Sequence, residues 1–481
     1  MNIYLVQVDY SKYFSQEIVP LGLLHIGSAL YNKGYKVNII HCTEQEIDKN
    51  VEEIVKNKPL WVGFSVMTGP QTMHSAWMSK KIKDKSDVPI VWGGIHPSIL
   101  PDQCLEEDYI DAVIIGEGEE TAIELTKVLE EKKDLEGILG LGHRNVNKKP
   151  CVHQKRPFIK NLDEDRYKLE FDLLDMSKYF LKAGKYKRVF SYKSSRGCPY
   201  NCSFCYNLEF NQRKWRAKSA ERVIEEIKYL KNKYSIDGIK FYDDNFYVDK
   251  NRALKILENI GIPAKTDIRI DMLTEDLASK IKNYNVFDIL IGIESGSNRI
   301  LELINKGFTV ECIKEGVKIL AKYDLRVGYS AIVGIPTETN EEMNATIDLI
   351  LWINSIHKNK TVTIGPFLPY PGSPLYDWSI NQGFVPPKKT EDWGFIERWK
   401  KDLYKYLPWV KDEYIYRIRE YMKFFNYSVP LLSNIAEFRL KNKFMSFPID
   451  IYVINYLYDE AVQEKTWLGK LVRKIHKLIK V

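Results

Sequence analysis

Short apolar runs alternate with amphipathic stretches along the first 130 residues of the chain. The apolar runs have the length of strands, and the stretches 21–33, 70–85 and 119–132 have the period of a helix. This alternation predicts an α/β fold in which helices cover both faces of a parallel sheet, with ligands at the carboxyl ends of the strands. The expected strands are Ile3–Val8, Lys36–His41, Leu60–Ser65, Pro89–Trp92 and Ala112–Ile115.

A second alternation begins at Arg188 and continues to about residue 370. Six strand–helix repeats in this length predict an open parallel (β/α)6 barrel, whose active site lies at the carboxyl ends of its strands. The expected strands are 188–194, 237–242, 264–270, 287–293, 326–333 and 361–367, and the expected helices include 218–233, 249–259, 309–323 and 338–356.

These patterns divide the chain into four expected parts. Residues 1–140 form a Rossmann-like domain, the weakly periodic residues 141–185 form a linker, and residues 186–375 form the partial barrel. Residues 376–481 form a mostly helical domain that is rich in basic and aromatic residues.

Composition narrows the class of protein further. The 481 residues are 44% hydrophobic and 28% charged, which is typical of folded domains and not of a disordered chain. Residues 381–481 hold 19 Lys and Arg against 12 Asp and Glu, so this part accounts for the whole net charge of +7. Residues 1–380 therefore carry no net charge, which argues against nucleic acid as a partner. Without a membrane-length apolar run or a signal-like N-terminus, we expect a cytoplasmic protein.

Three of the seven cysteines form a cluster directly after an expected strand. Cys198, Cys202 and Cys205 have the spacing C-x3-C-x2-C. Three thiolates on one tight loop can bind three irons of a 4Fe–4S cube and leave the fourth iron open to a small molecule. The alternative is a zinc knuckle, but zinc loops usually come as two pairs of ligands, and no second pair follows.

This cysteine loop resembles the signature of the radical S-adenosylmethionine (SAM) superfamily, and the resemblance extends over residues 186–370. It implies that the open iron binds SAM and that an electron from the cluster yields a 5′-deoxyadenosyl radical. The segments Tyr242–Phe246, Gly292–Ser297 and Ile332–Pro336 resemble further family motifs, although the last has Ser330 in place of the usual Gly and its acid displaced to Glu338. The residues expected to bind SAM are Phe204, Tyr242, Asp243, Asp244, Arg269, Glu294, Ser295, Gly334 and Ile335.

The four charged residues in this set have ordinary structural alternatives. Asp243 and Asp244 can cap the helix that follows them. Glu294 can be a surface acid at a strand end, and Arg269 can pair with a neighbouring acid.

Four glycine-containing elements of residues 1–140 precede the barrel in an order that resembles the cobalamin-binding domain of cobalamin-dependent radical SAM enzymes. The resemblance implies that they bind the cobalamin tail, with no protein histidine on the cobalt, because the D-x-H-x-x-G loop is absent. His96 belongs either to the loop that binds the cobalamin tail or to the packing at a strand end. The residues expected to contact cobalamin are Leu21, Gly22, Ser65, Thr68, Gly93, Gly94, His96, Pro97, Gly116, Glu117, Gly118 and Glu119.

The sequence WLGKLVRKIHKLIKV at 467–481 has an apolar helical face opposite a basic one. Such a helix can lie on an anionic membrane at the inner face, or it can dock on the protein with its basic face in solvent. A lipid substrate is suggested by this segment alone.

The combined hypothesis is a cobalamin-dependent radical SAM C-methyltransferase. It would act on an unactivated carbon of a lipid or other secondary metabolite, with electrons from a flavodoxin- or ferredoxin-type donor. No cysteine pair follows Cys205, which argues against auxiliary clusters and methylthiotransferases. Two alternatives remain: a rearrangement or cyclisation without methyl transfer, and a zinc-stabilised binding module.

Overall fold

The computed structural model describes residues 2–11, 18–145, 147–396, 403–410, 413–426, 430–445 and 448–451. The chain forms two compact units. The first comprises Met1–Asp267, Asn283–Phe287 and Pro369–Lys400, and the second comprises Ile268–Lys282, Asp288–Leu368 and Lys401–Val481. The amphipathic segment 467–481 lies outside the described residues. Among the residues that are described, no helix has the length and apolar character needed to cross a membrane.

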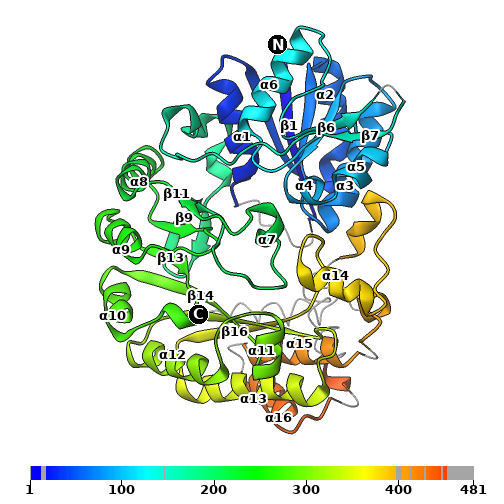
Figure 1. Cartoon of the computed structure of the whole chain (residues 1–481). Helices are drawn as coiled ribbons and strands as arrows, with labels where there is room; N and C mark the ends of the chain where they lie inside the picture. The colour runs from blue at the N-terminus through cyan, green and yellow to red at the C-terminus, as the bar shows by residue number, and fades with distance from the viewer. Residues whose placement is uncertain are drawn as a thin grey trace, which may run out of the picture. The chain divides into compact units, whose positions relative to one another are not determined.

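The first unit contains a seven-stranded sheet (Figure 1). Its strands are β1 (Asn2–Asp9), β2 (Lys36–Thr43), β3 (Trp61–Ser65), β4 (Ile90–Gly93), β5 (Ala112–Ile114), β6 (Leu141–Arg144) and β7 (Pro150–Val152). Their order is β2-β1-β3-β4-β5-β6-β7. Strands β1 to β5 are parallel, β6 pairs antiparallel with β5, and β7 pairs antiparallel with β6.

Alternate residues of the strands face two separate hydrophobic clusters. Ile3 and Leu5 pack on the face covered by helices α1 (Leu21–Tyr31) and α6 (Glu119–Glu130). Tyr4 and Val6 pack on the other face, which α2 (Ile47–Asn57) and α3 (Pro70–Lys83) cover. This two-sided burial explains why the strands read as continuous apolar runs. Shorter elements of this region are η1 (Glu44–Glu46), α4 (Ile95–Ile99) and α5 (Pro101–Glu106).

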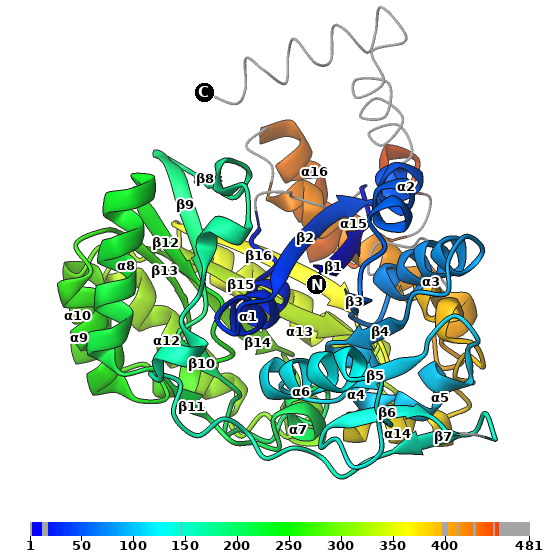
Figure 2. The same ribbon diagram turned by 90° about the horizontal axis from the view of Figure 1, so that it is seen from above.

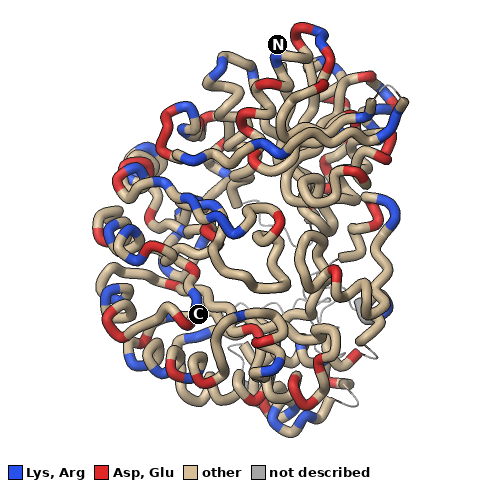
Figure 3. Tube along the Cα trace, viewed as in Figure 1, with Lys and Arg blue, Asp and Glu red and all other residues tan. Residues whose placement is uncertain are grey.

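The first unit also holds strands of the second alternation, namely β8 (Leu181–Ala183), β9 (Tyr186–Tyr192), β12 (Gly238–Phe241) and β13 (Ala264–Asp267). Strands β9, β12 and β13 are parallel neighbours, and β8 is antiparallel to β9. Helices α8 (Ala220–Tyr234) and α9 (Lys250–Asn259) cover the outside of these strands (Figure 2). Both helices contain basic and acidic residues (Figure 3), and Lys255 pairs with Glu221 between them.

Short elements complete the first unit. They are β10 (Ser195–Arg196), β11 (Arg216–Ala217), α7 (Asn207–Phe210), α14 (Pro374–Asn381), η2 (Asp165–Tyr167), η3 (Phe171–Leu173), η4 (Met176–Lys178) and η6 (Thr390–Phe395).

The second unit contains most of β14 (Val286–Glu294) together with β15 (Val327–Val333) and β16 (Lys360–Pro366), which pair in parallel in that order. Helix α13 (Asn340–Ile356) begins with a capping box between Thr339 and Glu342. Helix α15 (Tyr414–Phe425) packs against β16 and against α16 (Pro430–Lys441). The other elements are η5 (Ile270–Met272), α10 (Glu275–Asn283), α11 (Asn298–Leu303), α12 (Val310–Lys322) and η7 (Leu403–Tyr406).

The predicted α/β class is confirmed, since every expected strand and helix of the two alternations corresponds to an observed element. The described part of the C-terminal region is helical, as expected. Several short strands were not predicted, namely β6, β7, β8, β10 and β11. The residues expected to form a linker begin with the β6–β7 hairpin, which extends the first sheet through pairing of β6 with β5.

Candidate active site

The three clustered cysteines occupy the loop that follows β10. Cys198, Cys202 and Cys205 form no disulfide bond among the described residues and are partly buried, and the Cys205 amide donates a hydrogen bond to the Cys202 carbonyl at 3.0 Å. Burial raises the pKa of the Cys205 thiol to about 11, so a metal that binds here has to displace the thiol proton. Phe204 is partly buried in the same loop. A tight loop with three thiols fits three irons of a cluster.

Two adjacent aspartates hold this loop in place. Buried Asp243 accepts hydrogen bonds from the Ser194 amide at 2.7 Å and from the Ser194 and Ser195 hydroxyls, both at 2.6 Å. Asp244 accepts from the Gly197 amide at 3.0 Å and from the Tyr206 hydroxyl at 3.1 Å. The capping alternative for these aspartates is wrong, because Asp249 caps α9. Their contacts make them positioning residues of the cysteine loop.

Tyr242, which precedes the two aspartates, is partly buried, and burial raises its pKa. Its hydroxyl accepts a hydrogen bond from Lys240 Nζ at 2.5 Å.

The residues expected to contact cobalamin lie at or just beyond the carboxyl ends of β3, β4 and β5, or at the start of α1. A Cβ on Gly22 would lie 3.6 Å from Ser65 Oγ, and the Gly116 amide donates to Ser98 Oγ at 2.9 Å. Gly94 and Gly116 have φ of +97° and +77°. A Cβ on Gly94 would meet Val66 O at 2.9 Å, whereas one on Gly116 would have no neighbour within 4 Å among the described atoms. These glycine turns fit a ligand that approaches the backbone closely.

His96 is buried at the start of α4 and serves the packing there. Its Nδ1 lies 3.0 Å from Thr68 Oγ1, and its ring meets Trp393 edge-on at 5.8 Å between centroids. Burial lowers its pKa to about 3, so the imidazole is neutral. Pro97 follows it and is also buried.

Arg196 connects the glycine-rich loop after β5 with the cysteine loop. Its Nη1 lies 2.7 Å from Glu117 Oε1, and its Nη2 lies 2.6 Å from Glu119 Oε1. Glu117 also pairs with Arg216 at 2.7 Å. The role of Arg196 was not predicted, because it depends on contacts with residues 77 and 79 positions away.

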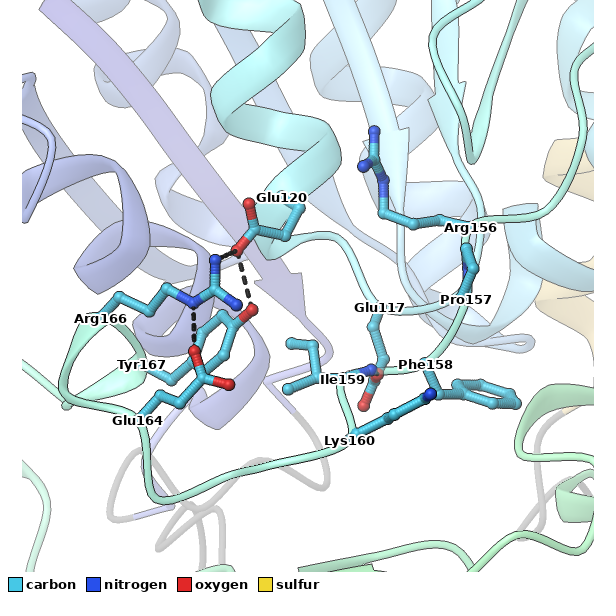
Figure 4. A pocket seen from close by; sticks show the side chains of 10 residues that line it. All are labelled: Glu117, Glu120, Arg156, Pro157, Phe158, Ile159, Lys160, Glu164, Arg166 and Tyr167. Atoms are coloured by element: carbon cyan, nitrogen blue, oxygen red, sulfur yellow. Dashed lines mark hydrogen bonds and ion pairs between the residues drawn. The ribbon is translucent and has the colours of Figure 1, made fainter.

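Glu117 also lines a cavity of about 440 Å³ (Figure 4). The other lining residues are Glu120 and members of the segment 156–167, where Tyr167 donates to Glu120 at 2.8 Å and Arg166 pairs with Glu164 at 2.7 Å. The carboxylates of this cavity are therefore mostly satisfied by the protein itself.

The remaining expected SAM residues belong to the second unit. Arg269 donates to the Lys306 carbonyl at 2.6 Å and pairs with Asp271 at 2.9 Å. The ion pair with Asp271 is the pairing with a neighbouring acid that was the structural alternative for Arg269. Glu294 is buried and lies 2.7 Å from Lys306 Nζ, so the interpretation as a surface acid is wrong. Ser295 Oγ lies 3.3 Å from Thr346 Oγ1.

Gly334 and Ile335 follow β15 and donate their amides to Glu338 at 2.5 and 3.1 Å. Burial raises the pKa of Glu338 to about 7. Trp409 Nε1 donates to the Gly334 carbonyl at 2.7 Å. The displaced acid of this motif thus binds the backbone of the turn.

Two family models match the chain: the radical SAM superfamily over residues 192–350 and a B12 binding domain over residues 11–126. An uncharacterised methyltransferase of Pyrococcus horikoshii is 36% identical over 372 residues, which cover 75% of this chain and 78% of that protein. An anaerobic magnesium-protoporphyrin IX monomethyl ester cyclase of Synechocystis sp. is 28% identical over 334 residues, or 66% of this chain and 64% of the cyclase.

A solved structure shows the same fold. The radical SAM methyltransferase TsrM of Kitasatospora setae, with cobalamin and a 4Fe–4S cluster bound, aligns with a TM-score of 0.62 at 18% identity, over 79% of this chain and 75% of its own.

The chain belongs to the cobalamin-binding radical SAM enzymes. Its architecture is a Rossmann-like cobalamin-binding sheet, a curled radical SAM half-barrel and a helical C-terminal region. Its cofactors are a 4Fe–4S cluster, SAM and cobalamin. Family membership excludes the zinc-stabilised binding module as the identity of the chain.

Proposed function

We propose that this enzyme transfers a methyl group from methylcobalamin to an unactivated carbon of a lipid or other secondary metabolite. The bound cofactors supply a 5′-deoxyadenosyl radical, which activates the substrate carbon, and the transferable methyl group. The relative from Pyrococcus horikoshii is named as a methyltransferase, which supports methyl transfer over other radical chemistry.

The ion pairs of Arg196 carry this proposal. Arg196 lies two residues before Cys198, and its guanidinium binds both carboxylates of the Gly116–Glu119 loop. Methyl transfer with both cofactors requires the cluster loop and the cobalamin loop to be held next to each other. A buried guanidinium shared by the two loops supports that arrangement within the first unit.

The individual SAM and cobalamin contacts remain proposals. Cys198, Cys202 and Cys205 would bind the three irons, with Asp243 and Asp244 orienting their loop. The backbone turns at Gly93, Gly94 and Gly116 would accommodate the cobalamin tail. The SAM contacts would come from the strand-end residues predicted for them.

The enzyme requires a reductant and a substrate. We propose a flavodoxin- or ferredoxin-type donor and a cytoplasmic location.

Peripheral contact with the inner membrane face through 467–481 is proposed from the sequence of that segment only. Flotation with anionic liposomes, compared between the full chain and a chain lacking 467–481, tests it. Equal flotation of the two, or none, would remove membrane contact through 467–481 and with it the argument for a lipid.

Methyl transfer is tested with anaerobically prepared holoenzyme, methyl-deuterated SAM and an extract of candidate metabolites. We expect 5′-deoxyadenosine together with a product that gains a deuterated methyl group by mass spectrometry. The matched control carries Cys198→Ala, Cys202→Ala and Cys205→Ala and should give neither compound. Formation of 5′-deoxyadenosine with an unlabelled product would overturn methyl transfer and retain the radical chemistry.

Cyclisation is the second candidate function. The match to the anaerobic magnesium-protoporphyrin IX monomethyl ester cyclase, which includes 66% of this chain, favours it. The same experiment separates the two, because a cyclised product takes up no deuterated methyl group.

A further inference from the structure

Four side chains with metal-binding atoms come together at the edge of the first sheet, away from the cysteine loop. They are Glu136, His143, Cys151 and His153, and their ligand atoms all lie within 4.8 Å of one another. Glu136 comes from the loop between α6 and β6, His143 from β6, Cys151 from β7, and His153 directly after β7. His143 and Cys151 are direct partners in the antiparallel pair.

The hydrogen bonds of the two histidines orient them as metal ligands. His143 Nδ1 lies 3.0 Å from the Arg144 carbonyl, and His153 Nδ1 lies 3.1 Å from the Ile138 carbonyl. A carbonyl only accepts, so each Nδ1 carries the proton, and the lone pair of a neutral ring is on Nε2. Donation from the other ring nitrogen to a backbone carbonyl is the usual support of a zinc-bound histidine.

Both Nε2 atoms are buried and have no hydrogen-bond partner among the described residues. They lie 3.4 and 3.3 Å from the two carboxylate oxygens of Glu136, and the rings meet edge-on with centroids 5.0 Å apart. Buried nitrogens without partners cost free energy unless another ligand satisfies them. A metal ion between them and the carboxylate would do so.

We propose that Glu136, His143, Cys151 and His153 bind one Zn²⁺ ion in a tetrahedral structural site. Zinc bonds of about 2.0–2.3 Å place tetrahedral ligands about 3.3–3.8 Å apart, so small side-chain rotations suffice. The mixed set of two imidazoles, a thiolate and a carboxylate suits zinc better than magnesium or calcium. On binding, the Cys151 thiol releases its proton to solvent and becomes a thiolate. Glu136 is exposed and gives the ion a path of entry.

The position of the site indicates a structural role. His143 pairs with Ala112, the first residue of β5, whereas the Gly116–Glu119 loop follows the last residue of that strand. The ion would thus join the α6–β6 loop to the β6–β7 hairpin at the end of β5 opposite the cobalamin loop. Four protein ligands leave no open position for chemistry.

The test uses the full chain with Cys198, Cys202 and Cys205 changed to alanine, so that the cluster loop cannot take up zinc. We expect close to one zinc per chain after removal of loosely bound metal. Adding His143→Ala and His153→Ala should abolish zinc binding. Adding Glu136→Gln instead, at an exposed position, should lower the affinity for zinc about 10-fold or more in a chelator competition. The matched control adds Cys312→Ala instead, and it should leave the zinc content and the affinity for zinc unchanged.

Cobalt(II) adds a readout that does not depend on stability. In the same cluster-free background, prepared without cobalamin, bound cobalt should show a thiolate-to-metal charge-transfer band that Cys151→Ser removes and Cys312→Ala retains. Zinc content that is unchanged by the histidine substitutions, or a cobalt spectrum without a thiolate band, would overturn the proposal.

Discussion

Arg196 Nη2 lies 2.6 Å from Glu119 Oε1, and both side chains are largely buried. The same guanidinium binds Glu117 at 2.7 Å, so one positive charge bridges two carboxylates, of which Glu117 is also paired with Arg216. Arg196 belongs to the short β10 strand before the cysteine loop, whereas Glu119 begins α6. The two cofactor-associated loops are therefore mechanically coupled through one side chain.

Replacing Arg196 should affect both cofactors together. Arg196→Ala leaves buried Glu119 with the neutral His25 ring 3.8 Å away and no cation among the described residues, and we expect a loss of about 3–5 kcal/mol in the free energy of unfolding. Iron and cobalamin content per chain should fall in parallel, as measured by metal analysis and by absorbance of the extracted cobalamin. Arg166→Ala breaks a more exposed pair with Glu164 and should cost only about 0–1 kcal/mol with both cofactors retained. Loss of one cofactor alone would contradict the coupling.

Local patterns were sufficient to predict the elements that position the site. The strands are apolar runs because helices cover both of their faces, and the cysteine spacing is contained in eight residues. The β6–β7 hairpin escaped prediction because its strands have four and three residues and include Arg144 and Pro150. Such short polar strands have no detectable period of their own.

The partners of charged residues were the least predictable part of the site. Glu117 and Glu119 were expected to contact cobalamin, but the structure pairs them with Arg196 and Arg216. Lys306, which binds Glu294, gave no signal in the sequence. These contacts join residues that are distant along the chain, so spacing alone cannot reveal them.

Asp244 should be required for the cluster rather than for the fold. Asp244→Ala removes the acceptor for the Gly197 amide and the Tyr206 hydroxyl, which frees the start of the cysteine loop. We expect iron and sulfide content to fall to about half or less after anaerobic reconstitution. Asp249→Ala removes an aspartate that caps α9 and accepts from the Arg252 amide, so it should lower stability by about 1 kcal/mol and keep the iron. Equal iron in both variants would argue against this role.

Gly116 and Gly184 provide a matched pair for the cobalamin loop. Both have positive φ, +77° and +57°, and a Cβ on either would meet no described atom within 4 Å. The backbone strain of an alanine is therefore similar at the two sites, about 1–2 kcal/mol. We expect Gly116→Ala to lower cobalamin content per chain and Gly184→Ala to leave it unchanged, since only the first occupies space in the proposed cobalamin loop. Identical cobalamin content in both variants would remove Gly116 from the site.

Glu338 should make stability fall as pH rises through neutrality. Burial raises its pKa from 4.5 to about 7, so the folded protein binds a proton that the unfolded chain releases between these values. Its contribution is complete below pH 4.5 and lost as pH rises through about 7, a change of about 1–3 kcal/mol.

Glu338→Gln keeps an oxygen that accepts from the Gly334 amide but cannot ionise. Thermal unfolding should therefore give similar midpoints for the variant and the parent enzyme at pH 5, and a higher midpoint for the variant at pH 8. Glu341→Gln, in the exposed first turn of α13, is the control and should follow the parent profile. A variant that tracks the parent at both pH values would show that Glu338 ionises freely in the folded enzyme. In that case, the hydrogen bonds from Gly334 and Ile335 outweigh the cost of burial.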